Sequence, residues 1–163
     1  EHPAALLGGR PRGERLLSLA VALRAYVFLG LFEAAAVLAA FFHVLDAGGW
    51  AYGTDLAAND PLYRQATTAS FAAIVLLQIV NVFLCRSAWR SAFSTGLGGN
   101  PLILWGVAFE AGLLVLISYT PWGNALFGTA PLPLEVWLFL LPWAAGMLAI
   151  EEARKWFVRR RSG

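Results

Sequence analysis

Apolar residues fall into four long runs along the chain, and each run predicts a membrane-spanning helix. A helix needs about 20 mainly apolar residues to cross the hydrocarbon core of a bilayer. The predicted spans cover residues 23–45, 65–85, 101–119 and 135–156. Between them lie stretches that hold Gly, Pro, Asp and Arg, the residues that favour turns and loops. The pattern therefore predicts an all-α membrane protein with four transmembrane helices.

Composition supports this interpretation and excludes other classes. The chain is 59 % hydrophobic and 13 % charged, against about 45–50 % and about 25 % in soluble domains. Its net charge is only +2, and the arginines flank apolar runs, so the expected partner is the lipid bilayer and not a nucleic acid. A single Cys excludes an internal disulfide, and two His without a Cys/His cluster argue against a zinc site.

The domain organisation follows from the same pattern. We expect a Pro/Gly/Arg-rich cytoplasmic linker over residues 1–22, with a possible interfacial helix near residues 14–19. Residues 23–156 form the predicted four-helix transmembrane domain, and residues 157–163 form a basic cytoplasmic tail. Because the chain begins at Glu1 and not at Met, we expect it to be a piece of a longer protein.

Three loops connect the predicted spans, at residues 46–64, 86–100 and 120–134. The first and third contain a single basic residue, Arg64, whereas the linker, the middle loop and the tail are rich in Arg. Cytoplasmic segments carry the excess of Lys and Arg. The sequence therefore predicts a multi-pass protein of the cell membrane with both termini cytoplasmic.

Four polar side chains interrupt the apolar runs. Measured along the helix from the predicted cytoplasmic ends, Glu33, Gln78 and Glu110 lie roughly 12–13 Å deep, and Asn81 lies roughly 8 Å deep. Three spans thus place a carboxyl or carboxamide group close to the middle of a core about 30 Å thick. Residues three apart share a helix face, so Gln78 and Asn81 point the same way.

These side chains allow two interpretations. Carboxylate and amide oxygens are ligands for hard cations, and a carboxylate inside a membrane normally faces the bundle interior or an aqueous path. A cation or proton pathway therefore has Gln78, Asn81 and Glu110 as candidate ligands, with Glu33 as a weaker one. Alternatively, the amides and protonated glutamates join the helices through hydrogen bonds.

Other polar residues favour a structural interpretation. His43 is expected near the outer membrane boundary. Glu151 and Glu152 are expected on a solvated helix face, where Glu151 can pair with Arg154 or Lys155. The sequence contains no arrangement typical of a catalytic nucleophile and its base.

Three segments resemble the C-terminal membrane region of type II P-type cation ATPases, the group of the calcium pump and the sodium/potassium pump. They read LLQIVNVFLCRSAWRSAF, NPLILWGVAFEAGLLVLISYTPWGNALF, and EVWLFLLPW followed by IEEARKWFVRR. The resemblance covers nearly the whole chain and implies the last four of ten transmembrane helices. Gln78 then matches an eighth-helix glutamate of the calcium pump, and Asn81 matches an aspartate of the sodium pump. Glu110 resembles a ninth-helix glutamate linked with ion or proton binding, and Glu33 falls on the seventh helix.

The resemblance places catalysis outside this chain. The family's phosphorylation motif DKTG and its TGE motif do not occur in this sequence. We therefore expect no catalytic or cofactor-binding residue here. Mg-ATP and the transported cation would belong to the whole pump, and the preceding transmembrane helices of that pump would be partners. A free-standing four-span protein without ATPase activity, such as a small channel, assembly factor or scaffold, is the alternative.

Overall fold

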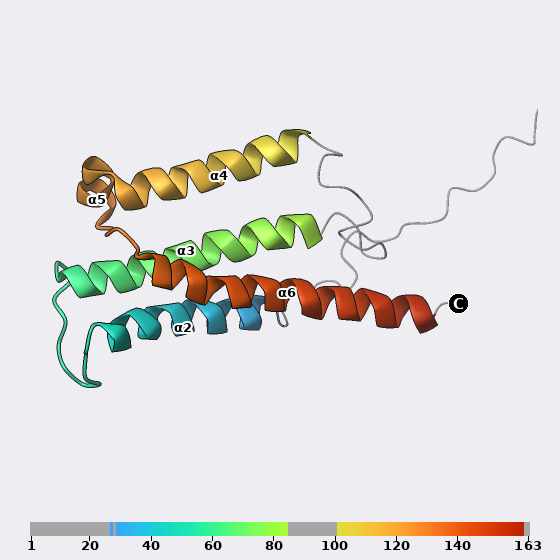
Figure 1. The fold of residues 1–163 in the computed structure, drawn as a ribbon, viewed down its shortest axis with the longest axis horizontal. Coiled ribbons are helices and arrows are strands. Elements are labelled where there is room, and N and C mark those ends of the chain that lie inside the picture. The colour runs from blue at the N-terminus through green and yellow to red at the C-terminus, as the bar shows by residue number, and fades with distance from the viewer. Residues whose placement is uncertain (1–26, 28, 85–100, 162–163) are drawn as a thin grey trace, which may run out of the picture. The chain divides into compact units, whose positions relative to one another are not determined.

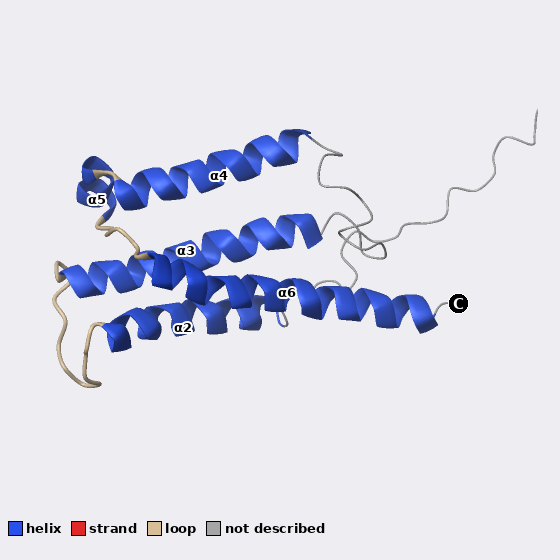
Figure 2. Ribbon diagram, in the orientation of Figure 1, coloured by secondary structure: helices blue, strands red, loops and turns tan. Residues whose placement is uncertain are grey.

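A computed structural model of the chain describes residues 27, 29–84 and 101–161, and the described part is helical apart from short loops (Figures 1 and 2). The helices are α2 (Gly30–Ala47), α3 (Pro61–Leu84), α4 (Pro101–Tyr119), α5 (Pro121–Phe127) and α6 (Leu134–Arg161). Four of them, all except α5, are long and apolar enough to cross a membrane. For the residues described, the prediction of an all-α structure with four long apolar helices is confirmed.

The chain divides into two compact units, residues 1–31 and residues 32–163. In the first unit the structure describes Val27 and the segment from Leu29 to Leu31, which is helical. The second unit holds the rest of α2 and all of α3 to α6. The predicted interfacial helix near residues 14–19, the linker and the 86–100 loop lie outside the described residues.

The second span begins four residues earlier than predicted, and its loop is correspondingly shorter. Asp60 is followed by Pro61, and the backbone N–H of Leu62 donates to Asp60 Oδ1 at 2.8 Å. An Asp cap with Pro at the first helical position is a strong start signal for a helix. The expectation of a loop through residue 64 was wrong because it followed the apolar run and not the cap.

The predicted loop at 120–134 also contains a helix that the sequence analysis missed. Thr120 caps α5 by accepting a hydrogen bond from the Gly123 N–H at 3.2 Å. Gly128 ends α5 in the left-handed conformation, with φ of 66°, which glycine adopts without steric cost. Pro121 thus ends α4 and also starts the next helix.

Helix α3 is the centre of the second unit, because small side chains cover one of its faces. Ala66, Ala69, Ala72 and Ala73 are almost completely buried. Small residues let helix backbones approach closely in lipid, and here Ser70 Oγ donates to the Val37 carbonyl of α2 at 3.3 Å. Figure 1 shows α3 lying between α2 and α4, and α3 also packs along α6.

Hydrogen bonds hold the C-terminal end of α4 and the start of α6 together. Trp137 Nε1 donates to Tyr119 Oη at 2.7 Å, and Tyr119 Oη donates to the Leu132 carbonyl at 2.7 Å. Thr68 Oγ1 on α3 accepts from the Ala130 N–H at 2.9 Å. The segment between α5 and α6 is therefore fixed to both α3 and α4.

Part of the polar end of α6 is buried, although Glu151 was expected on a solvated helix face. Glu151 and Lys155 are both 0 % exposed. Lys155 Nζ donates to the carbonyl of Leu84, the last residue of α3, at 3.0 Å, and it lies 3.8 Å from a carboxylate oxygen of Glu152. The prediction failed because the ammonium group of Lys155 contacts a backbone carbonyl of another helix, a partner that the local charge spacing does not reveal.

We predict that Lys155→Met destabilises the protein by about 1–3 kcal/mol, because it removes the charged donor of the buried hydrogen bond to the Leu84 carbonyl. The measurement is thermal unfolding in detergent, with tryptophan fluorescence as the signal that monitors it. Arg160→Gln is the control, since this exposed arginine lies over the Trp156 ring at 3.9 Å and loses an equal charge. An equal loss in both variants would contradict a specific role for Lys155.

A second prediction concerns the tight turn between α4 and α5. A Cβ atom on Gly123 would lie 2.7 Å from the Ile117 carbonyl oxygen and 2.8 Å from that of Leu116. Gly123→Ala should therefore cost about 1–3 kcal/mol of stability, the usual penalty for overpacking.

The matched control is Gly112→Ala in α4, where a Cβ atom meets nothing within 4 Å. This change should be neutral or stabilising by up to about 1 kcal/mol, because Ala favours the helix over Gly. Thermal unfolding of the two variants would separate the steric effect from the helix preference. If Gly123→Ala were as stable as Gly112→Ala, the turn could accommodate a Cβ atom without loss of stability, which would contradict the prediction.

Candidate functional site

Two of the polar side chains singled out from the sequence meet between α2 and α3. The side chains of Glu33 and Gln78 form a hydrogen bond. Because an ionised carboxylate only accepts hydrogen bonds, the Gln78 amide N–H is then the donor. The contact joins helices that run antiparallel, and Ser70 and Val37 form the neighbouring link nearer to the loop. The structure thus brings together residues that lie 45 positions apart in the sequence.

This pair lies at the surface of the second unit and not in its packed centre. Gln78 is exposed and Glu33 is half-buried. On α3, Gln78 shares an exposed stripe with Phe71, Ile74 and Val82, which follow helical spacing. An exposed carboxamide is unfavourable in hydrocarbon. The Gln78 side chain therefore requires a polar neighbour, or other protein segments that cover this stripe.

The other two candidates are placed differently. Asn81 is half-buried and lies one turn further along α3 from Gln78. Glu110 is half-buried in the middle of α4. Among the described residues no hydrogen bond or ion pair joins the Glu110 carboxylate to another side chain. The structure therefore groups Glu33 and Gln78, and it leaves Glu110 apart on a helix that packs against α3 and α5.

The described residues include no group of three or more His, Cys, Asp and Glu side chains that could hold a metal ion. His43 stacks on Phe139 of α6, with ring centroids 4.0 Å apart and planes inclined by 4°. This packing agrees with a structural role for His43. Because the described residues hold no such group of metal ligands, a cation at the Glu33–Gln78 pair would need oxygen ligands from outside this pair.

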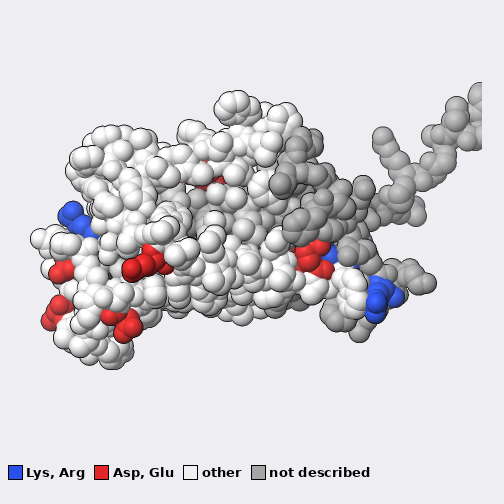
Figure 3. All heavy atoms as spheres, in the orientation of Figure 1, with Lys and Arg blue, Asp and Glu red and all other residues white. Residues whose placement is uncertain are grey.

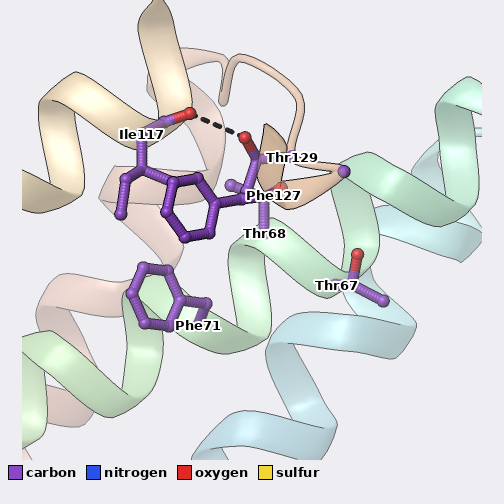
Figure 4. A pocket seen from close by; sticks show the side chains of 7 residues that line it. Thr67, Thr68, Phe71, Ile117, Phe127 and Thr129 are labelled. Carbon is purple, nitrogen blue, oxygen red and sulfur yellow. Dashed lines mark hydrogen bonds between the residues drawn. The ribbon is translucent and has the colours of Figure 1, made fainter. Parts of the chain in front are cut away.

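A separate pocket of about 330 Å³ lies between α3, α4 and the end of α5 (Figure 4). Figure 4 shows the side chains of Phe71, Ile117 and Phe127 around the same space. Its hydroxyl groups are bonded within the chain: Thr129 Oγ1 donates to the Ile117 carbonyl at 2.6 Å, and Thr68 Oγ1 donates to the Arg64 carbonyl at 2.6 Å. The pocket is apolar and offers no set of free oxygen atoms for a cation.

The Glu33–Gln78 pair has the chemistry of a partial cation or proton site. The carboxylate provides one negative charge, and the amide keeps its carbonyl oxygen after donating its N–H. Sequence reasoning placed both groups at one depth, but it could not show that they touch.

The burial of Lys155 was not predicted from the sequence. This ammonium group lies against the last residue of α3, but its spacing on α6 resembles that of an exposed charge pair.

Comparison with known proteins places these features in a family. The family model "Cation transporting ATPase, C-terminus" matches residues 4–157. The chain is 25 % identical over 177 aligned residues to potassium-transporting ATPase alpha chain 1 of Xenopus laevis, which covers 94 % of this chain and 17 % of that protein.

Two further relatives match at similar levels. Sodium/potassium-transporting ATPase subunit alpha-4 of Rattus norvegicus is 30 % identical over 96 residues, covering 59 % of this chain and 9 % of the relative. The probable cation-transporting ATPase F of Mycobacterium bovis is 31 % identical over 101 residues, covering 62 % of this chain and 11 % of the relative.

The chain thus spans less than a fifth of the length of these curated relatives. The family match covers nearly all of the chain, and the structure has the four apolar helices that the sequence pattern predicts. The chain belongs to the P-type cation-transporting ATPase family and corresponds to its C-terminal membrane domain.

Proposed function

We propose that this chain is the C-terminal part of the membrane domain of an ATP-driven cation pump. It supports the transport helices and contributes polar side chains to the ion pathway. The observation that carries the proposal is the hydrogen-bonded pair of Glu33 and Gln78 on an uncovered surface inside the predicted membrane. Uncovered polar groups at this depth require a polar neighbour, which the preceding transmembrane helices of a pump would supply.

In this proposal the chemistry of ATP lies elsewhere in the pump. The phosphorylation, nucleotide-binding and actuator domains would precede this chain and would use Mg-ATP. The chain lacks the DKTG and TGE motifs, and its described polar residues include no nucleophile paired with a base. Its contribution would be to bind and position the cation while the other domains drive the conformational cycle.

The distribution of charge supports an orientation with both termini in the cytoplasm. Figure 3 shows acidic side chains gathered around the loop between α2 and α3 and the start of α6. Of the described charged residues at this end, Asp46, Asp55, Asp60 and Glu135 are acidic and Arg64 is basic. The positive-inside rule places such a poorly basic end outside the cell.

The orientation can be tested by labelling single cysteines in intact cells, after replacing Cys85 by Ser. A membrane-impermeant maleimide should label Tyr52→Cys, because Tyr52 is 92 % exposed in the outer loop. It should not label Arg160→Cys until the cells are permeabilised. The opposite labelling pattern would contradict the proposed orientation.

A second prediction concerns Glu110, a half-buried carboxyl group in the middle of α4. If this group contributes to the ion pathway, Glu110→Gln in the full-length pump should change the cation concentration for half-maximal ATPase activity by about tenfold, or should alter its pH dependence. Gln keeps the shape of the side chain and removes only its ability to ionise.

The control for Glu110→Gln is Glu135→Gln, the same change at an exposed position at the start of α6. ATPase activity would be measured against a panel of Na⁺, K⁺, Ca²⁺ and Mg²⁺ at several pH values. Activation curves for Glu110→Gln that coincide with those of the control would exclude Glu110 from the pathway.

A further inference from the structure

A pocket of about 370 Å³ lies where α2 ends and the loop to α3 begins. It is lined by Phe42 and Asp46 of α2 and by Trp50 and Tyr52 of the loop. Phe42 and Asp46 are four positions apart and therefore share one face of the helix. Three aromatic side chains and one carboxylate thus border a common space at the end of a predicted membrane span.

The backbone at the end of α2 fixes the position of Trp50. The Gly49 N–H donates to the Asp46 carbonyl at 2.9 Å, and the Trp50 N–H donates to the Leu45 carbonyl at 2.9 Å. With Gly49 at a φ of 75°, these two bonds form a Schellman motif, which ends a helix at a left-handed glycine. Trp50 Nε1 also donates to the Thr54 carbonyl at 2.9 Å. The indole ring is therefore held in place by the chain itself.

The second loop ring stands beside the first at a steep angle. The ring centroids of Trp50 and Tyr52 are 6.0 Å apart, and the ring planes are inclined by 74°. Tyr52 is 92 % exposed, so packing within the described residues does not require its ring. Among those residues no hydrogen bond or ion pair engages the Tyr52 hydroxyl or the Asp46 carboxylate. The pocket thus presents aromatic faces and a negative charge that the described fold leaves unused.

We propose that this pocket binds a quaternary ammonium group, with the aromatic rings facing the cation and Asp46 balancing its charge. Aromatic faces attract such cations within about 6 Å of a ring centroid, and cages of aromatic rings recognise choline and methylated lysine in this way. A quaternary ammonium has no N–H donor, so it needs no set of acceptors. An inorganic cation such as Ca²⁺ would need about 6–8 oxygen ligands, and the side chains here supply oxygen only from Asp46 and Tyr52.

The place of the pocket indicates where such a group would come from. Trp and Tyr at the end of a membrane span lie at the level of the lipid headgroups, so the choline headgroup of phosphatidylcholine is within reach. Free choline carries the same trimethylammonium group. The inference does not depend on the proposed ion pathway, because all four lining residues lie at the end of α2 or in the loop that follows it.

The test compares two lipids with identical acyl chains, phosphatidylcholine and phosphatidylglycerol, of which only the first has an ammonium group. Native mass spectrometry of the full-length protein in detergent gives the dissociation constant of the first lipid bound. We expect the protein to bind phosphatidylcholine about fivefold more tightly than phosphatidylglycerol, as for one to two cation–π contacts at an exposed site. Tyr52→Ala removes one aromatic wall and should bring this ratio close to one.

Matched variants separate this role from a general effect on the loop. Tyr52→Phe keeps the ring and should keep the preference for phosphatidylcholine. Asp46→Asn removes the charge at the pocket and should reduce the preference, whereas Asp55→Asn makes the same change at an exposed position of the same loop that does not line the pocket and should leave it intact. Thermal unfolding should be the same for Tyr52→Ala and Tyr52→Phe, because the side chain is exposed.

Equilibrium dialysis with radiolabelled choline distinguishes the two sources of the ammonium group. If choline binding depends on the Tyr52 ring while the lipid ratio does not, the quaternary ammonium site stands with free choline as its ligand. If Tyr52→Ala equals Tyr52→Phe in both measurements, the inference is overturned. It is also overturned if the unaltered protein shows no preference for phosphatidylcholine and binds no choline. None of these measurements uses ATPase activity, so each of these results leaves the proposed function untouched.

Discussion

Close approach of the helices along the alanine face of α3 is the constraint on which the rest of the second unit depends. Ala66, Ala69, Ala72 and Ala73 of α3 are buried, and on a neighbouring face Ser70 donates to a carbonyl of α2. In lipid there is little hydrophobic gain from joining two apolar helices, so packing and hydrogen bonds must hold them. The small side chains of α3 make close packing possible, and α3 packs along α6 and α4.

Polar groups then mark two different levels of the bundle. Near the loop after α5, the hydroxyl groups of Thr68, Tyr119 and Thr129 are all bonded to the backbone, and an apolar pocket lies beside them. Deeper along α3, the Glu33–Gln78 pair keeps part of its bonding capacity and lies on an uncovered surface. The hydroxyl groups stabilise the fold, whereas the Glu33–Gln78 pair offers oxygen atoms of the kind that bind cations.

The charged end of α6 shows how tertiary structure changes the meaning of a local pattern. Glutamates followed three and four residues later by Arg and Lys are typical of a solvated helix. In this chain Lys155 of α6 is buried against α3, where its ammonium group donates to the Leu84 carbonyl. Nothing in the spacing of residues 151–155 reveals that contact, since its partner lies 71 positions away.

The sequence by itself determined the helical class and the four long apolar helices of the described residues, because apolar run length is a local property. It also contained the capping residues Asp60 and Thr120, which start α3 and α5. Both were missed because the predicted bounds followed the apolar runs, and the caps lie outside those runs. Only the tertiary structure decided which polar groups meet. Gln78 touches Glu33 while Glu110 has no such contact among the described residues, because helix rotation and neighbour choice depend on side-chain packing between segments far apart in the chain.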